Sequence, residues 1–167
     1  MKRVLSGLAL AATLAMPSFA QEVQVGRFGV QVNLPVGLND RDLHWIMGEA
    51  PTNDDGRAFT LDGAPVMVAV YGSYLWQDDF AQAVAMAEDY AEEGESEITY
   101  RAGGARWAVL SGYRADGTVF YHRMELAADC DDDGDVLINV MIERGPDATW
   151  FDALTGAIAE SLRGCRE

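Results

Sequence analysis

Alternating apolar and polar positions dominate residues 97–143, and this pattern predicts three or four consecutive β-strands. Two such runs, within residues 106–127, flank the sequence Ala115-Asp116-Gly117. Asp-Gly between two alternating runs is typical of a β-hairpin, because glycine tolerates the positive φ that tight turns require. The rest of the chain is expected to pack around this hairpin.

The alternation also predicts a register for the hairpin. A two-residue loop of Asp116 and Gly117 gives four cross-strand pairs: Tyr113 with Phe120, Ser111 with His122, Val109 with Met124, and Trp107 with Leu126. These eight side chains would share one mainly apolar face, because paired residues point to the same side of a sheet. The other face would carry a mixed set: Arg106, Leu110, Tyr121, Arg123 and Glu125.

Ser111 and His122 would form the polar pair on this apolar face. One interpretation is a Ser-His dyad or a buried pH-sensitive group. No nucleophile-elbow motif surrounds Ser111, and no orienting acid can be placed beside His122. The favoured interpretation is a core histidine that a neighbouring hydroxyl satisfies.

Further strands are predicted before the central stretch. Residues 22–34 indicate one or two strands broken at Gly26, and residues 58–61 and 66–74 indicate a hairpin around Asp62-Gly63. Residues 49–57 have the composition of a loop. Residues 38–47 fit either a short helix or a strand.

Residues 78–93 change to a helical period. Their apolar positions form one stripe: Phe80, Val84, Ala87 and Ala91. Asp78 or Asp79 is the expected N-cap, and Gly94 is expected to end the helix.

Residues 148–163 are predicted to form a second helix. The apolar stripe consists of Trp150 or Phe151, Leu154, Ile158 and Leu162. Asp147 is the expected N-cap, and Gly164 is expected to end the helix.

Residues 1–20 have the form of a secretory signal peptide, with Lys2 and Arg3 before an apolar run and small residues up to Ala20. Cleavage is expected between Ala20 and Gln21. The apolar run is short for a membrane span, and no later stretch approaches one. The sequence therefore predicts a soluble periplasmic or secreted protein, with residues 21–167 as a single domain.

The chain is strongly acidic, with a net charge of −15. Loss of residues 1–20 would remove Lys2 and Arg3, leaving ten basic against twenty-seven acidic residues and a net charge of −17. Such a surface repels nucleic acids and anionic lipids, and it suits a basic protein partner or divalent cations.

Cys130 and Cys165 are the cysteines of the chain. In an oxidising compartment, an isolated pair is most simply a disulfide. A last strand over residues 136–144 would lead away from Cys130, and the terminal helix could return antiparallel to it. We therefore expect a Cys130–Cys165 bridge.

The segment around Cys130 is an acidic turn, residues 129–135. Asp129, Asp131, Asp133 and Gly134 match the opening of a calcium-binding loop, and Asp135 follows them. The twelfth loop position is Val140 where a bidentate glutamate is required, and the flanks indicate strands. A solvated turn is the favoured interpretation, with Asp129, Asp131, Asp133 and Asp135 as a candidate Ca²⁺ set.

Other site motifs are missing from the sequence. The two histidines, His44 and His122, do not form a zinc motif, and no nucleotide-binding motif is present. No cofactor and no catalytic residue is therefore expected.

Several segments resemble the PsbP/Mog-like family, particularly its exported bacterial members. They are NDDGRAFTLDGAPVMVAVYG at 53–72, ITYR at 98–101 with W-x-V-L-S-G at 107–112, VFYHRM at 119–124, and the last strand with the terminal helix. The resemblance implies an α+β fold of the α/β/α sandwich type, a central antiparallel sheet flanked by helices on both faces. It also implies an accessory role, because family members are mostly non-enzymatic, such as an extrinsic photosystem subunit and a nuclear regulator of a small GTPase.

The expected function is therefore an exported non-enzymatic accessory or protein-interaction domain. The second interpretation is a periplasmic small-ligand or Ca²⁺-binding protein, which would use the acidic turn or a pocket beside His122. The third is a hydrolase that uses Ser111 and His122.

Overall fold

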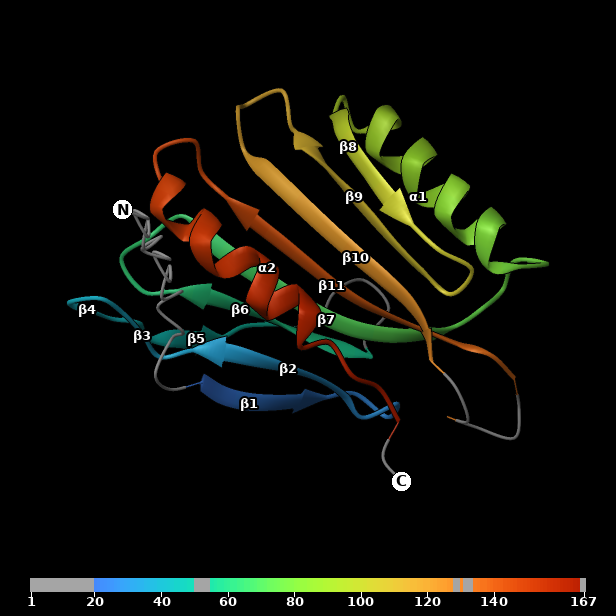
Figure 1. Ribbon diagram of the computed structural model, residues 1–167, viewed down its shortest axis with the longest axis horizontal. Helices are drawn as coiled ribbons and strands as arrows, with labels where there is room; N and C mark the ends of the chain where they lie inside the picture. The colour runs from blue at the N-terminus through green and yellow to red at the C-terminus, as the bar shows by residue number, and fades with distance from the viewer. Residues whose placement is uncertain (1–19, 50–54, 128–129, 131–133, 166–167) are drawn as a thin grey trace, which may run out of the picture.

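The computed structural model describes residues 20–49, 55–127, 130 and 134–165, whose helices and strands make an α+β fold (Figure 1). Its centre is a seven-stranded antiparallel sheet in the order β5-β6-β7-β11-β10-β9-β8. The strands are β5 (Trp45–Met47), β6 (Gly56–Leu61), β7 (Val66–Tyr74), β8 (Glu97–Gly103), β9 (Trp107–Tyr113), β10 (Val119–Ala127) and β11 (Val136–Arg144). The consecutive strands expected in residues 97–143 are confirmed as β8 to β11.

The N-terminal part adds a separate hairpin of β1 (Ala20–Val25) and β2 (Val30–Pro35), which packs against the sheet. The expected break at Gly26 is confirmed, since Gly26 and Gly29 both have positive φ in the turn. The undecided segment, residues 38–47, consists of short strands. These are β3 (Gly37–Leu38), paired with β4 (Arg41–Asp42), and the edge strand β5.

The hairpin of β9 and β10 exists, but its predicted register is wrong by one residue. Arg114 N donates to Thr118 O at 2.8 Å, and Gly117 N donates to Arg114 O at 2.9 Å, so the loop holds three residues. Gly117 has a φ of 84°. A type I turn followed by a left-handed glycine uses one residue more than a two-residue turn.

The corrected register moves the two strands' side chains to different faces. Ser111 lies opposite Tyr121, and His122 lies opposite Leu110. Since side chains alternate along each strand, Ser111 and His122 point to opposite faces of the sheet. The predicted pairing of Ser111 with His122 is therefore wrong.

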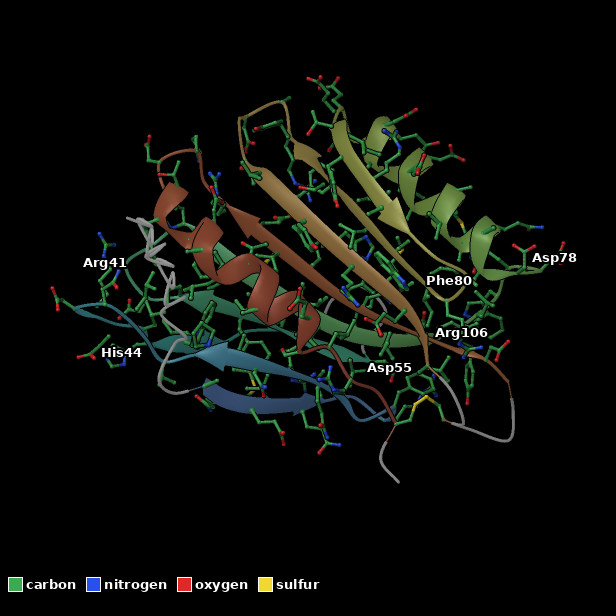
Figure 2. The ribbon with its side chains drawn as sticks, in the orientation of Figure 1. Arg41, His44, Asp55, Asp78, Phe80 and Arg106 are labelled. Atoms are coloured by element: carbon green, nitrogen blue, oxygen red, sulfur yellow. A yellow bond between two sulfur atoms is a disulfide. The ribbon has the colours of Figure 1, made fainter. Side chains whose placement is uncertain are left out.

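Helix α1 (Phe80–Glu93) confirms the predicted first helix. The Asp79 side chain accepts a hydrogen bond from Gln82 N at 2.8 Å, and Gly94 is the C-cap. Asp78 and Phe80 mark the beginning of this helix in Figure 2, and the helix lies beside β8 in Figure 1. Arg101 of β8 pairs with Glu88 at 3.2 Å, which ties the helix to the edge of the sheet.

The second helix is shorter than predicted. A 3₁₀ turn, η1 (Thr149–Phe151), precedes α2 (Asp152–Glu160), and no side chain caps the turn at Ala148. The prediction that Asp147 caps an α-helix here is wrong. Phe151 is completely buried and packs edge-on against Trp45 and Trp150, so tertiary packing sets the geometry of this entry.

Two apolar clusters share the sheet. The larger one joins α2 and η1 with residues of β2, β6, β7 and β11, and the smaller one joins α1 with β9 and β10. Alternate residues of β11 point to the two clusters, and its even-numbered residues from Val136 to Ile142 lie in the larger one. Leu137 packs against the smaller cluster instead.

The predicted disulfide is confirmed between Cys130 and Cys165, and it is the yellow bond near the C-terminal segment in Figure 2. Arg163 exchanges two backbone hydrogen bonds with Gln31 of β2, and Cys165 N donates to Phe28 O at 2.9 Å. The bridge and these bonds together hold the segment from Arg163 to Cys165 after α2.

Residues 1–19 of the expected signal peptide lie outside the described part, and Ala20 and Gln21 begin β1. Cleavage between them stays a prediction. Among the helices of the described residues, none has the length and apolar character that crossing a membrane requires.

Candidate functional site

A cavity of about 340 Å³ lies between α1 and the sheet. Most of its wall is apolar, and methionines contribute from three elements: Met86 of α1, Met124 of β10 and Met141 of β11. Phe120, Leu110 and Leu137 complete the apolar floor. Binding sites for small molecules have this size and this composition, with a few polar groups that fix orientation.

Three side chains from neighbouring strands supply a polar spot in this wall: Tyr71 of β7, Asn139 of β11 and His122 of β10. Tyr71 and Asn139 lie directly opposite each other in the sheet. His122 Nε2 lies 3.0 Å from Asn139 Oδ1 and 3.4 Å from the Tyr71 hydroxyl. The polar groups therefore converge on one imidazole nitrogen.

The hydrogen bonds assign the tautomer of His122. Asn139 Nδ2 donates to the carbonyl of Leu137 at 3.4 Å, so Asn139 Oδ1 faces the imidazole. Because that oxygen only accepts, Nε2 of His122 carries the proton. In the neutral ring, Nδ1 is then an acceptor, and it has no partner among the described residues.

Burial keeps this spot uncharged. Desolvation lowers the pKa of His122 from its ordinary value of 6.5, an effect that the hydrogen bond with Asn139 partly opposes. Burial also raises the pKa of Tyr71 to about 12. Both side chains are therefore neutral at pH 7.

One charged residue, Arg114, lies in the described wall of the cavity. Its Nη2 group donates to Glu143 Oε1 of β11, which is mostly buried. The Nε atom of Arg114 is buried and has no partner among the described residues. The guanidinium is thus neutralised by a carboxylate of the protein.

Aromatic side chains lie at the rim of the cavity. Trp76, which precedes α1, is 81% exposed, and Tyr90 of α1 is 67% exposed. Trp76 packs edge-on against Tyr74 with 6.0 Å between ring centroids. Large apolar surfaces left open to water beside a cavity are typical of a binding site.

The structure does not bring Ser111 and His122 together. Ser111 Oγ donates to the carbonyl of Phe120 at 2.8 Å and lines a separate hollow of about 260 Å³ beside α2. His122 faces the cavity beneath α1 on the other side of the sheet. The residues of the proposed dyad thus belong to two different surfaces.

The candidate Ca²⁺ set falls mainly outside the described residues, which include neither Asp129, Asp131 nor Asp133. Asp135 is described, and its backbone carbonyl accepts from Leu75 N at 2.9 Å. Within the described part of the chain, no group of three or more His, Cys, Asp or Glu side chains could hold a metal ion.

Sequence reasoning singled out His122 but missed Tyr71 and Asn139. Asn139 is a polar residue in the otherwise apolar run VLINVMI of β11, and it is only 2% exposed. A polar residue in the middle of a buried strand signals a polar partner, because buried polar groups must be hydrogen-bonded. That signal, combined with the correct register, would have located the spot.

Comparison with known proteins provides no relative from which a role for this site could be transferred: no protein-family model, curated protein or solved structure matches the chain.

Proposed function

We propose that the protein is an exported, soluble, non-enzymatic binding protein that holds a small, mainly apolar molecule beneath α1. The observation that carries this proposal is the cavity of about 340 Å³, with its apolar wall and its polar spot of Tyr71, His122 and Asn139. Specific binding requires both parts, since apolar area supplies affinity and a few placed polar groups supply orientation.

The cavity wall combines a rigid and an adaptable side. Most of its floor belongs to β7, β10 and β11, and β11 pairs with both neighbours over its full length. Met86, Met124 and Met141 can adjust to a ligand, because the unbranched methionine side chain fits irregular shapes. This combination favours reversible binding of a molecule with apolar bulk.

Two observations support export and the wider architecture that we propose. A disulfide between Cys130 and Cys165 is typical of an oxidising compartment, in agreement with the signal-like sequence of residues 1–20. The separate packing of α1 and α2 into different clusters supports an α/β/α sandwich of PsbP/Mog-like type. A periplasmic accessory protein is the role in best agreement with both.

A fluorescence titration with the neutral probe N-phenyl-1-naphthylamine tests the proposal. The wild-type protein should bind the probe with a saturable rise in emission. Ala87→Trp should abolish this binding, because Ala87 lines the cavity and tryptophan would fill it. Ala85→Trp is the matched control, since Ala85 is exposed on the same helix. Equal binding by all three proteins would contradict the proposal.

A second candidate function is docking of a protein partner on strands β8 to β10, on the face of the sheet that points away from the cavity and α1. There, Tyr100, Trp107 and Tyr113, here called the aromatic face, are each more than one-third exposed. Arg123 lies over Trp107 with 5.3 Å to the ring centroid and pairs with Glu125. Tyrosine, tryptophan and arginine are the residue types enriched in protein interfaces.

Charge favours a basic partner for the aromatic face. Glu97 lies beside Tyr113 in the sheet, and Asp116 and Glu160 are exposed nearby on the adjoining turn and on α2. The arginines on this face have carboxylate partners, because Arg123 pairs with Glu125, and Arg144 pairs with Asp152. A partner with an apolar centre and a lysine- or arginine-rich rim would complement this surface.

Crosslinking in the native envelope tests the second candidate. A partner captured by the wild type should be lost with a Tyr100→Asp/Tyr113→Asp variant and at high salt, and it should be basic. Tyr90→Asp is the control, since it places the same change on α1. A partner that the double variant retains, or that carries an acidic surface, would contradict docking at the aromatic face.

A further inference from the structure

The wall of the cavity offers no counter-charge for an ionised ligand. Arg114 is the one permanently charged residue in the described wall, and Glu143 already pairs with it. An anionic ligand would therefore compete with a carboxylate of the protein, and a cationic ligand would meet no acidic side chain in that wall. Moving an unpaired charge from water into such a site is costly.

The polar spot instead offers one acceptor and one donor. His122 Nδ1 accepts, because Asn139 fixes the proton on Nε2. The Tyr71 hydroxyl lies 3.4 Å from that Nε2 proton donor and keeps its own proton for another acceptor. A ligand hydroxyl or amide has both a donor and an acceptor, so it can donate to His122 Nδ1 or accept from the Tyr71 hydroxyl.

We infer that the cavity selects an uncharged ligand whose apolar body carries a hydroxyl or amide group, which hydrogen-bonds to His122 or Tyr71 in the wall. This inference rests on the proposed function and specifies the class of ligand. The neutral state of both side chains agrees with it, since burial disfavours the imidazolium and the phenolate. The acidic surface of the chain would further repel anionic amphiphiles.

Competition among three ligands of equal chain length tests the inference. Octanol, octanoate and octylammonium are each titrated at pH 7 against protein loaded with N-phenyl-1-naphthylamine. Octanol should displace the probe at a concentration at least about tenfold lower than either ion, since burial of an unpaired charge is penalised.

Two substitutions locate the hydroxyl. Tyr71→Phe removes one oxygen with little change in shape, and it should weaken octanol binding about two- to tenfold. His122→Phe removes the acceptor and should weaken octanol binding by a similar factor. Thermal melts of both variants check that each remains folded, and probe binding without competitor checks that the cavity remains open.

The outcomes separate this inference from the proposed function. Displacement by octanoate or octylammonium as readily as by octanol would overturn the neutral class while leaving ligand binding intact. Octanol affinity unchanged in both Tyr71→Phe and His122→Phe would overturn the assigned position of the hydroxyl. Failure of the wild type to bind the probe or octanol would overturn the proposed function itself.

Discussion

His122 and Asn139 are hydrogen-bonded across the neighbouring strands β10 and β11, with 3.0 Å between Nε2 and Oδ1. They are not direct partners in the sheet, since His122 lies opposite Met141 and Asn139 lies opposite Met124. The bond therefore runs diagonally over the sheet surface. It satisfies the carboxamide oxygen of a buried asparagine and fixes the orientation of the imidazole toward the cavity.

Replacing Asn139 should reveal the dependence of His122 on this bond. We expect Asn139→Leu to lower the free energy of unfolding by about 1–3 kcal/mol, because a buried donor loses its acceptor. The double variant Asn139→Leu/His122→Phe should recover part of this loss, since the imidazole donor that Asn139→Leu leaves unpaired is then removed as well. Urea unfolding of the wild type and of both single and double variants measures the coupling. Additive losses in the double variant would show that the bond has no energetic role.

The free energy of unfolding should decrease as the pH falls from 6.5 to the lower pKa of His122 in the folded protein. Its pKa is lowered in the folded protein, first by burial, from the ordinary value of 6.5. As the pH falls below 6.5, the unfolded chain takes up a proton that the folded chain does not bind until the pH reaches its lower pKa. The free energy of unfolding should therefore decrease with falling pH across that window.

Comparison of the wild type with His122→Phe separates the contribution of His122 from that of the carboxylates, because both proteins have the same carboxylates. The wild type should lose more stability than the variant between pH 7.5 and pH 5.5 in urea titrations. His44→Phe is the control, because His44 is exposed, and it should retain the wild-type response. Parallel pH profiles for the wild type and His122→Phe would contradict the lowered pKa.

The disulfide should contribute substantially to stability. Cys130 and Cys165 are 35 residues apart, and closing a loop of this length stabilises a chain by about 3–4 kcal/mol in the chain-entropy model. Dithiothreitol should lower the urea midpoint of the wild type to that of Cys130→Ser/Cys165→Ser. The double variant itself should not respond to dithiothreitol. Equal midpoints for oxidised and reduced wild type would contradict this expectation.

The N-cap residue of α1, Asp79, should contribute more to the free energy of unfolding than Asp78, the residue before it. Asp79 accepts from the backbone amide of Gln82, whereas Asp78 accepts from the Gln82 side chain at 3.3 Å. We expect Asp79→Ala to cost about 0.5–2 kcal/mol of unfolding free energy, because an amide of the first turn loses its acceptor. Asp78→Ala should cost less in the same thermal or urea melts. Equal losses would show that the cap bond is not the cause.

The strands and the first helix could be predicted from local patterns, but of the polar spot only His122 could. An amphipathic helix is predicted from the spacing of Phe80, Val84 and Ala87 alone. Its N-cap and C-cap are Asp79 and Gly94. The hairpin register depended on whether Asp116-Gly117 forms the whole loop or its last two residues. The second case holds, because Ala115 joins the turn and Gly117 adopts the left-handed conformation.

The inclusion of Ala115 in the loop decides which side chains share a face of the sheet. In the predicted register, His122 shares a face with Ser111, whereas in the structure it shares the cavity with Tyr71 and Asn139. Tyr71 lies 51 residues away along the chain, so its position depends on the order β7-β11-β10 in the sheet. Alternation within one hairpin carries no information about this order. The second helix shows a similar effect, since burial of Phe151 overrides the expected cap at Asp147.

Methyl-¹³C-methionine NMR tests the central claim most directly, because methionines lie both inside and outside the cavity. On titration with octanol, the methyl signals of Met86, Met124 and Met141 should shift, since these residues line the cavity. The signals of Met47, on the edge strand β5, and of Met67, on β7 away from the cavity wall, should stay in place. Saturable shifts confined to the three cavity methionines are the predicted result. Shifts at Met47 and Met67 alone, or no shift at any methionine, would contradict ligand binding beneath α1.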